Sequence, residues 1–280
     1  MIIEAKGLTY TYPIGAKPAF EDVTISVEEG EFVLLSGPSG CGKTTLVRSF
    51  NGLIPHFYGG KLEGEIRVVG LQVAEHPIHE LAQHVGMVFQ NPENQLFALS
   101  VEKDVAFGLE NLGLPREEIR NRVDWALETT GISNLRDRAP YELSGGQQQR
   151  VAIASVLAMK PEVIVLDEPT SFLDPQGAKQ IFEVIRNLNK DLGITIVLVE
   201  HRLDLTAKYA DRVMVMDKGR VVLDGGPREV FSSEEARLIG VGIPKATRLY
   251  QFLKTEGTNL GKVPLSSEEA YQAIAEVLNT

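Results

Sequence analysis

A glycine-rich segment of the chain has the spacing of a phosphate-binding loop. The pattern GxxxxGK(S/T) is filled by Gly37, Pro38, Ser39, Gly40, Cys41, Gly42, Lys43 and Thr44. In such a loop the backbone N–H groups and the positive end of the following helix dipole bind phosphate oxygens. The lysine reaches the β- and γ-phosphates, and the hydroxyl beside it binds Mg²⁺. We therefore predict that Lys43 and Thr44 hold a nucleotide and its Mg²⁺, with Thr45 assisting at the α-phosphate.

Two alternatives exist for this segment: a glycine-rich turn without a ligand, and a nucleophilic role for Cys41. The context favours phosphate binding, because an apolar run ends at Leu35, and Leu46, Val47 and Phe50 follow the loop at helical spacing. Cys41 is the single cysteine of the chain and lies outside any metal-ligand spacing. We interpret it as a residue that fills the loop.

Two adjacent carboxylates follow an apolar run further along the chain. Asp167 and Glu168 come directly after Val163–Leu166, an arrangement that brings acidic groups to the edge of a phosphate site. We expect Asp167 to hold Mg²⁺ through water and Glu168 to orient or deprotonate the attacking water. The alternative is a strand that ends in surface acids, which a phosphate loop earlier in the chain makes less favourable.

The elements that must position these groups are strands and helices in alternation. Short β-branched runs after Gly30 and Gly64 predict strands at residues 31–35 and 65–69. The near-continuous apolar runs Val163–Leu166 and Ile194–Val199 are typical of parallel strands that are buried on both faces. We therefore predict an α/β fold with a sheet core.

The remaining sequence is mostly helical. Residues 77–159 predict a helical subdomain inserted into the sheet domain, with Ile119, Val123, Ala126 and Leu127 on one face of a helix. After about residue 226 the pattern changes to short helices between Gly and Pro. The pairs Ser232 with Glu235 and Ser266 with Glu269 predict capping boxes there, and Ala270, Ile274, Val277 and Leu278 predict one apolar helix face.

Composition limits the class of protein. The chain has 280 residues, 43% of them hydrophobic, which is enough for one large domain and a small appendage. Its longest apolar runs are shorter than the roughly 20 residues that cross a bilayer, and residues 1–6 do not resemble a secretory signal. A net charge of −10 argues against a general nucleic-acid binder, although a local basic patch would still be compatible with it. The single cysteine fits a reducing compartment.

A five-residue signature links these motifs to a family. The sequence LSGGQ is formed by Leu143, Ser144, Gly145, Gly146 and Gln147, and a helical stretch follows over residues 148–158. With the phosphate loop and the acidic pair, this sequence resembles the ATP-binding-cassette (ABC) ATPases over residues 1–225. The resemblance implies the fold of a P-loop NTPase, ATP and Mg²⁺ as ligands, and a signature that closes over the γ-phosphate bound to a partner subunit.

Other motifs of that family follow in order. Gln90 matches the glutamine that touches Mg²⁺ and the attacking water and relays to a membrane partner, and His201 matches the histidine that contacts the γ-phosphate. Residues 171–174 resemble the D-loop, but Phe172 stands where the family usually has a small residue. This departure puts communication across the dimer in doubt, not nucleotide binding.

The family also places an aromatic ring against adenine, upstream of the phosphate loop. Tyr12 and Tyr10 both lie in that region, and Tyr10 has an ordinary core role as its alternative. We assign the adenine contact to Tyr12.

Two further segments resemble the energy-coupling-factor (ECF) and cobalt or nickel uptake branch. They are residues 89–97 and 101–108, and residues 10–13 and the short C-terminal appendage at 226–280 fit as well. The alternative is the helix that follows Gln90 in any ABC ATPase. The branch implies a second ATPase, identical or paralogous, and a transmembrane coupling protein that contacts the groove near Gln90. A small membrane protein would bind the vitamin or transition-metal ion, and the chain would be peripheral on the cytoplasmic face of the membrane.

Three other functions are alternatives to this one. A non-transport ABC ATPase typically has a long coiled-coil insertion or two cassettes in one chain, which this sequence lacks. A P-loop kinase has no reason to contain LSGGQ. An ABC importer for peptides, amino acids or metals shares all the catalytic motifs and therefore stays open. Because specificity in this family resides in the membrane subunits, these residues do not distinguish a vitamin from a metal ion.

Overall fold

A six-stranded sheet carries the phosphate loop at the carboxyl end of one of its inner strands. The computed structural model describes residues 1–258 and 260–278. Among these residues the strand order is β10-β9-β3-β8-β7-β6, with β10 antiparallel to β9 and the other neighbours parallel. The strands are β3 (Phe32–Ser36), β6 (Val85–Val88), β7 (Val163–Asp167), β8 (Thr195–Val199), β9 (Arg212–Asp217) and β10 (Arg220–Gly225). The predictions of a sheet core with strands at 31–35, 163–166 and 194–199 are confirmed.

The central strands are apolar because both faces of this sheet are covered. Every residue of β3, β7 and β8 is buried. Successive side chains of a strand point to opposite faces. In β3, Phe32 and Leu34 belong to a core formed with helices, whereas Val33 and Leu35 belong to a core formed with a second sheet. The sheet is therefore the middle layer of three.

The second sheet is antiparallel and covers the face of the first that bears the phosphate-loop helix. Its order is β2-β1-β4-β5, with β1 (Ile3–Thr11), β2 (Phe20–Val27), β4 (Lys61–Val68) and β5 (Leu71–Gln72). Between the layers lie the short helices α1 (Lys43–Val47) and α2 (Leu53–His56), whose buried side chains include Leu46, Val47 and Ile54. The strand predicted at 65–69 is the last part of β4.

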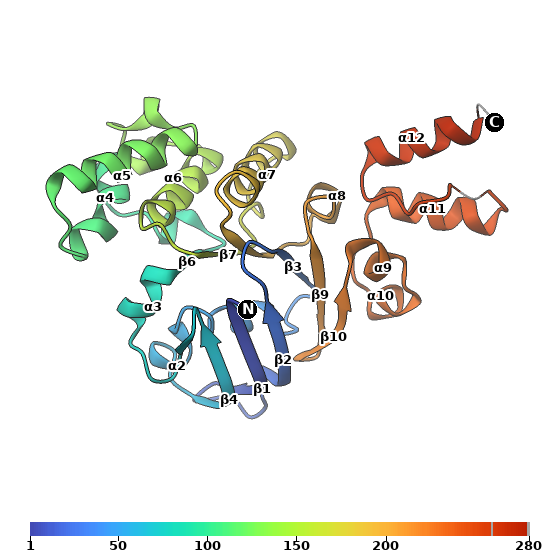
Figure 1. The fold of residues 1–280 in the computed structure, drawn as a ribbon, viewed down its shortest axis with the longest axis horizontal. Helices are drawn as coiled ribbons and strands as arrows, with labels where there is room; N and C mark the ends of the chain where they lie inside the picture. The colour runs from blue at the N-terminus through green and yellow to red at the C-terminus, as the bar shows by residue number, and fades with distance from the viewer. Residues whose placement is uncertain (259, 279–280) are drawn as a thin grey trace.

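The other face is covered by helices. Those between the strands are α4 (Val101–Asn111), α5 (Arg116–Thr129), α6 (Gly145–Ala158), α7 (Pro175–Lys190) and α8 (Leu203–Thr206), with the 3₁₀ turns η1 (Pro92–Asn94), η2 (Ser133–Leu135) and η3 (Pro140–Glu142). The helix α3 (Ile78–His84) instead lies on the side of the second sheet, where its Leu81 is buried in the same core as Ile54 of α2. The apolar face predicted for α5 is present, with Val123, Ala126 and Leu127 buried. The segment predicted as the helical subdomain, 77–159, also contains β6, which pairs with β7 in the main sheet. The helices α4, α5 and α6 pack together beyond that strand (Figure 1).

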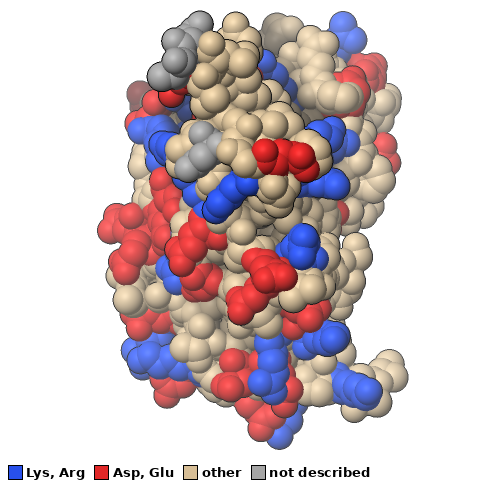
Figure 2. Space-filling model, turned by 90° about the vertical axis from the view of Figure 1, so that its right-hand side faces the viewer, with Lys and Arg blue, Asp and Glu red and all other residues tan. Residues whose placement is uncertain are grey.

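Among the described residues after 226, the helices are α9 (Pro227–Ser232), α10 (Glu234–Ile239), α11 (Lys245–Thr255) and α12 (Ser267–Leu278). The predicted apolar face of α12 is buried at Ala270, but Val277 and Leu278 are exposed. Figure 2 shows this side of the molecule, where Lys and Arg side chains are interspersed with Asp and Glu. In the described part of the chain, no helix has both the length and the apolar composition that crossing a membrane requires.

One of the two predicted capping boxes is wrong. Ser232 lies in the last turn of α9, where its hydroxyl donates to the Glu229 carbonyl, and Ser233 caps α10 instead by accepting from the Ala236 N–H. Ser266 does cap α12, since its hydroxyl accepts from the Glu269 N–H.

In this second capping box, the glutamate side chain accepts from the backbone N–H of the residue before the capping serine. The Glu269 carboxylate accepts from the Leu265 N–H at 2.9 Å rather than from Ser266, and it forms an ion pair with Arg228 of α9. This pair lowers the pKa of Glu269 and joins the first and last helices of the C-terminal part.

Candidate nucleotide-binding site

The predicted catalytic residues lie beyond the carboxyl ends of four adjacent strands. Along the sheet, β3 leads into the phosphate loop, β8 into His201, β7 into Glu168, and β6 into Gln90. Ligands of open α/β sheets bind at this edge of the strands. The order in space differs from the order in the chain because β8 lies between β3 and β7. The sheet therefore gathers residues that are far apart in sequence.

Two glycines let the phosphate loop fold against the rest of the sheet domain. Gly37 has φ +143° and Gly42 has φ +108°, values that disfavour any residue with a Cβ. A Cβ on Gly37 would lie 2.1 Å from the Met216 carbonyl oxygen, and one on Gly42 would lie 2.5 Å from that of Ala19. The loop backbone is thus held between β9 and the start of β2.

Lys43 is held inside the loop that it follows. The side chain is 5% exposed, and its ammonium donates to the carbonyls of Gly37 at 2.9 Å and Pro38 at 3.0 Å. The third neighbour is the Cys41 sulfur at 3.9 Å, the weakest of the three contacts. Because an ammonium has three donors, a phosphate oxygen can replace the sulfur without loss of the two carbonyl bonds.

Cys41 is packed in the loop rather than presented to a substrate. It is 6% exposed, and burial raises the pKa of its thiol above the ordinary value, which outweighs the opposing effect of Lys43. Thiolate is the reactive form of cysteine. The geometry therefore favours the interpretation of Cys41 as a filler of the loop.

This gives a labelling prediction for the folded chain. At neutral pH iodoacetamide should leave Cys41 unmodified over minutes, and the labelling rate should increase as the pH rises toward the raised pKa of the thiol. Mass spectrometry gives a clear readout because the chain has one cysteine. The chain unfolded in urea is the control and should take up one label quickly. Equally fast labelling of the folded chain would contradict the packed position.

Thr44 and Asp167 meet beside the loop. The Thr44 hydroxyl donates to Asp167 Oδ1 at 3.0 Å, and Asp167 is 4% exposed. Burial raises the pKa of Asp167, while the hydrogen bond from Thr44 opposes this effect. A hydroxyl and a carboxylate are the hard oxygen donors that Mg²⁺ prefers, and Mg²⁺ in nucleotide sites commonly uses one or two such ligands together with phosphates. The donor set therefore fits magnesium.

Glu168 is the centre of a polar cluster. Its Oε2 accepts from Gln90 Nε2 and from the Ser171 hydroxyl, both at 3.0 Å, and its Oε1 lies 3.1 Å from His201 Nε2. The structure thus brings together three of the predicted residues, Glu168, Gln90 and His201. Ser171 was part of the D-loop segment in the sequence, but no role was predicted for it.

The backbone of Glu168 is in a left-handed conformation, with φ +49°. Such a conformation is uncommon for a residue other than glycine and occurs where the surroundings over-determine it. Here the Glu168 N–H donates to the Val199 carbonyl of the neighbouring strand at 2.9 Å. The turn aims the carboxylate at Gln90 and His201 instead of letting it follow the alternation of β7.

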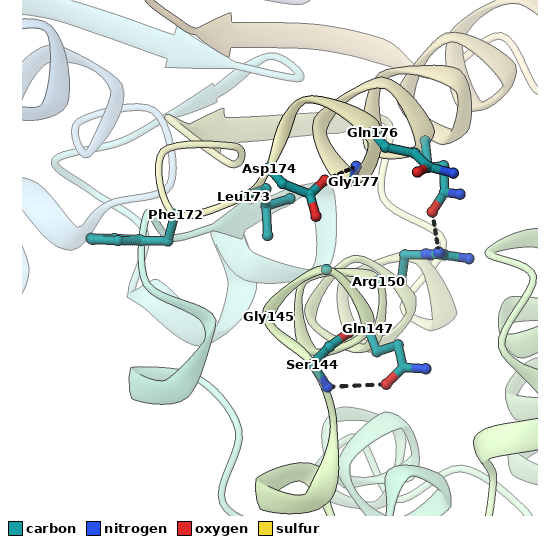
Figure 3. A pocket seen from close by; sticks show the side chains of 11 residues that line it. Ser144, Gly145, Gln147, Arg150, Phe172, Leu173, Asp174, Gln176 and Gly177 are labelled. Atoms are coloured by element: carbon teal, nitrogen blue, oxygen red, sulfur yellow. Dashed lines mark hydrogen bonds between the residues drawn. The ribbon is translucent and has the colours of Figure 1, made fainter.

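The signature lies apart from the phosphate loop. Ser144 precedes α6, and its N–H donates to Gln147 Oε1 at 3.0 Å (Figure 3). Together with Gly145 and Gly146 it lines a hollow whose other wall is the D-loop and the start of α7, including Asp174. No residue of the phosphate loop lines this hollow. Within one chain the signature therefore does not complete the nucleotide site.

Phe172 departs from the D-loop pattern and is 70% exposed. It lies where the hollow of the signature meets a second groove, lined by Gln90, residues 91–93, Gln148 and Gln149. In Figure 3 its ring extends away from Ser144 and Asp174. A large apolar side chain is thus presented on the surface between the signature and Gln90.

The two tyrosines near the loop have different surroundings. Tyr10 is fully buried, its hydroxyl donates to the Gly59 carbonyl at 2.8 Å, and burial raises its pKa. Tyr12 is partly exposed, and its hydroxyl lies 3.1 Å from that of Thr45. Their rings meet edge to face, with centroids 4.9 Å apart. The geometry favours Tyr12 as the adenine contact, and that role stays a prediction.

The fold and the site together define a P-loop nucleotide-binding protein, and comparison with known proteins identifies the family. A sequence model of the family described as ABC transporter matches residues 20–171. EcfA1, an energy-coupling factor transporter ATP-binding protein of Caldanaerobacter subterraneus subsp. tengcongensis, is 44% identical over 277 residues, which are 98% of each chain. The chain belongs to the ABC transporter ATP-binding proteins, and it resembles the ECF members.

Two solved structures support the same family and fold. CbiO1 from Clostridium perfringens, part of the ABC transporter complex CbiONQ, has a TM-score of 0.76 and 40% identity over 90% of this chain and 98% of its own. The ATP-binding cassette MJ0796, solved as a dimer bound to ADP and Pi, has a TM-score of 0.70 and 31% identity over 81% of this chain and 99% of its own. The predicted fold of an ABC ATPase domain is confirmed.

Two of the similar curated proteins are longer than this chain. One comes from Methanosarcina mazei and is 46% identical over 277 residues, and the other comes from Methanosarcina acetivorans and is 46% identical over 278 residues. These alignments cover 99% of this chain but 47% and 44% of the relatives, so the chain spans about half their length.

Proposed function

We propose that this chain hydrolyses ATP as a subunit of an ECF-type ABC transporter and thereby energises uptake of a vitamin or a transition-metal ion. The observation that carries the proposal is the cluster in which Glu168 meets Gln90 and His201 beside the Thr44–Asp167 pair. The similarity to EcfA1 supports the ECF branch. The fold and motifs are equally compatible with another class of ABC importer, which is the second candidate.

Each residue of the nucleotide-binding site has a separate role in phosphoryl transfer. Lys43 and the loop N–H groups bind the phosphates. Thr44, Asp167 and Gln90 would hold Mg²⁺, which would neutralise charge on the phosphate oxygens. Glu168 accepts a proton from the attacking water, and His201 contacts the γ-phosphate oxygens. Most of the rate enhancement then comes from positioning and electrostatic stabilisation.

A second ATPase chain, identical or paralogous, completes each site in this proposal. The hollow lined by the signature contains no residue of the phosphate loop of the same chain, and the similar cassette MJ0796 was solved as a dimer. Ser144 of one chain would face Lys43 of the other. The exposed apolar residues of the C-terminal helices, Leu238, Phe252 and Leu278, support a further contact between the two ATPases.

The proposed membrane partner contacts the surface next to Gln90. Phe97 and Leu99 are 65% and 77% exposed, and Phe97 packs edge to face on Phe107 with centroids 4.6 Å apart. Asp104 is 5% exposed and accepts from the N–H groups of Phe97 and Ala98, which fixes this segment. An apolar surface of this kind fits a helix of a coupling protein at the cytoplasmic face of the membrane.

Purification from the native membrane tests the transporter assignment. The tagged chain in mild detergent should copurify with an ATPase, a coupling membrane protein and a small integral membrane protein. Leu99→Asp should abolish this association and leave ATP hydrolysis of the isolated chain unchanged, because Leu99 is largely exposed and lines neither the hollow of the signature nor the groove at Gln90. Leu192→Asp, at another exposed apolar position, is the matched control and should copurify normally. Recovery of two large permease subunits would favour the other importer class, and exclusively soluble partners would contradict the transport function.

A further inference from the structure

A buried carboxylate precedes the histidine of the site. Glu200 is 2% exposed, and both of its oxygens are hydrogen-bonded. Oε1 accepts from the N–H groups of His201 at 2.8 Å and Arg202 at 3.0 Å, and Oε2 accepts from the Thr170 hydroxyl at 2.7 Å. Thr170 is itself fully buried. A buried charge needs such donors because leaving it unpaired is costly, so these bonds fix Glu200 in one position.

The neighbours of Glu200 bind the same loop. The loop comprises residues 168–173. It is followed by Asp174, whose side chain accepts from the Gly177 N–H at the start of α7. His201 Nε2 contacts Glu168 at 3.1 Å, and the Arg202 guanidinium donates to the Leu173 carbonyl at 2.7 Å. The three residues that follow β8 thus form hydrogen bonds to the beginning, the middle and the end of this loop.

The far end of this loop belongs to the surface that bears the signature. Phe172 and Leu173 line the hollow that also contains Ser144 and Gly145. The near end carries the Glu168 carboxylate. A displacement of His201 can therefore reach that surface through two hydrogen bonds of its neighbours, in addition to its own contact with Glu168. These are the bond between Glu200 and Thr170 and the bond between Arg202 and Leu173. We define these two hydrogen bonds as the clasp.

We propose that Glu200 is a positioning residue that makes His201 and the loop 168–173 move as one unit, so that ATP contact is transmitted to the surface that receives the second chain. The inference rests on the proposed function of the site. It predicts that breaking the clasp uncouples ATP binding from dimer formation and turnover without weakening ATP binding by one chain. The two hydrogen bonds of the clasp are the physical contacts through which the nucleotide site and this surface would influence each other.

Thr170→Val tests the clasp most directly, since it removes the hydroxyl and keeps the shape. We expect the KM for ATP to stay within about twofold and kcat to fall about tenfold or more, the loss expected when one hydrogen bond to a charged group is removed. In a Glu168→Gln background, ATP-driven dimerisation measured by size exclusion with light scattering should weaken by a similar factor. Thr170→Ser retains the hydroxyl and should restore both kcat and dimerisation.

Thr195→Val is a matched control at the opposite end of β8. Thr195 is also fully buried, and its hydroxyl accepts from the Gly30 N–H at 2.9 Å, away from the nucleotide site. It should lower the melting temperature without changing kcat of the folded protein. If Thr170→Val does not fold, Arg202→Met, which removes the bond to Leu173, takes its place with the same expectations.

The unmodified chain is measured first, so that the two proposals fail in different ways. Absence of ATP hydrolysis by the unmodified chain would overturn the proposed function. Normal hydrolysis by that chain, with an unchanged kcat and unchanged ATP-driven dimerisation in Thr170→Val, would overturn the clasp alone. A raised KM at constant kcat would also overturn it, because the role would then be in nucleotide binding.

Discussion

Replacing Glu168 by Gln is expected to stop ATP hydrolysis and to leave ATP binding intact. Gln keeps the shape of the side chain and still offers an oxygen to His201 or Gln90, but it cannot take a proton from water. Proton transfer by a positioned carboxylate contributes about 10²- to 10⁴-fold to a rate, so kcat should fall by that factor. The left-handed backbone conformation at position 168 is equally demanding for Glu and for Gln, so the substitution should not change the fold.

Phosphate release and equilibrium binding of a fluorescent ATP analogue measure the two effects separately. Glu183→Gln, on an exposed position of α7, makes the same chemical change away from the site and should have unchanged activity. Rapid turnover by Glu168→Gln would reject Glu168 as the residue that activates water. Loss of ATP binding in this variant would instead assign the carboxylate to the binding of Mg²⁺.

Lys43→Ala should abolish ATP binding under conditions in which the unmodified chain is saturated. The ammonium is buried and joined to two carbonyls of the loop, so its removal deletes both a charge for the phosphates and two bonds that hold the loop. Each hydrogen bond to a charged group contributes about 1.5–3 kcal/mol, which corresponds to about a 10- to 150-fold change in Kd. Because the charge and the support of the loop are lost together with this bond, the decrease in affinity should reach the upper end of that range.

Isothermal titration with Mg²⁺ and ATP measures this change in affinity. Lys179→Ala, which removes an exposed lysine of α7, should bind ATP normally. The variant must also be shown to be folded, and its melting temperature in the absence of ATP serves for this. Unchanged affinity in a folded Lys43→Ala variant would contradict the assignment of the phosphate loop.

The sequence predicted the parts of the fold that have strong local signals. The strands β3, β7 and β8 are buried on both faces, so their apolar runs are unbroken and easily recognised. The phosphate loop and the signature are contiguous motifs, and their chemistry depends on spacing. By contrast, β6 has four residues including Gly86, and its neighbours are helical, so nothing in the segment itself showed that it pairs with β7.

The contacts within the site depend on tertiary structure, which local patterns do not contain. A glutamate before a histidine reads as a polar pair, and only the meeting of β8 with the loop after β7 shows that Glu200 is buried against Thr170. Likewise, the approach of Gln90 to Glu168 joins residues 78 positions apart. At the start of α10, Ser232 and Ser233 are both capping residues by type, and the end of α9 decides between them.

The strand order also has a consequence for the synthesis of the protein. The strand β8 lies between β3 and β7 but follows both of them in the chain. A nascent chain that has not yet reached Thr195 contains the phosphate loop and Glu168, yet it lacks the strand that places them side by side. A ligand stabilises only those states of a protein that contain its site. Cellular ATP can therefore assist the maturation of this domain only after β8 has left the ribosome, and the earlier segments must avoid aggregation without it.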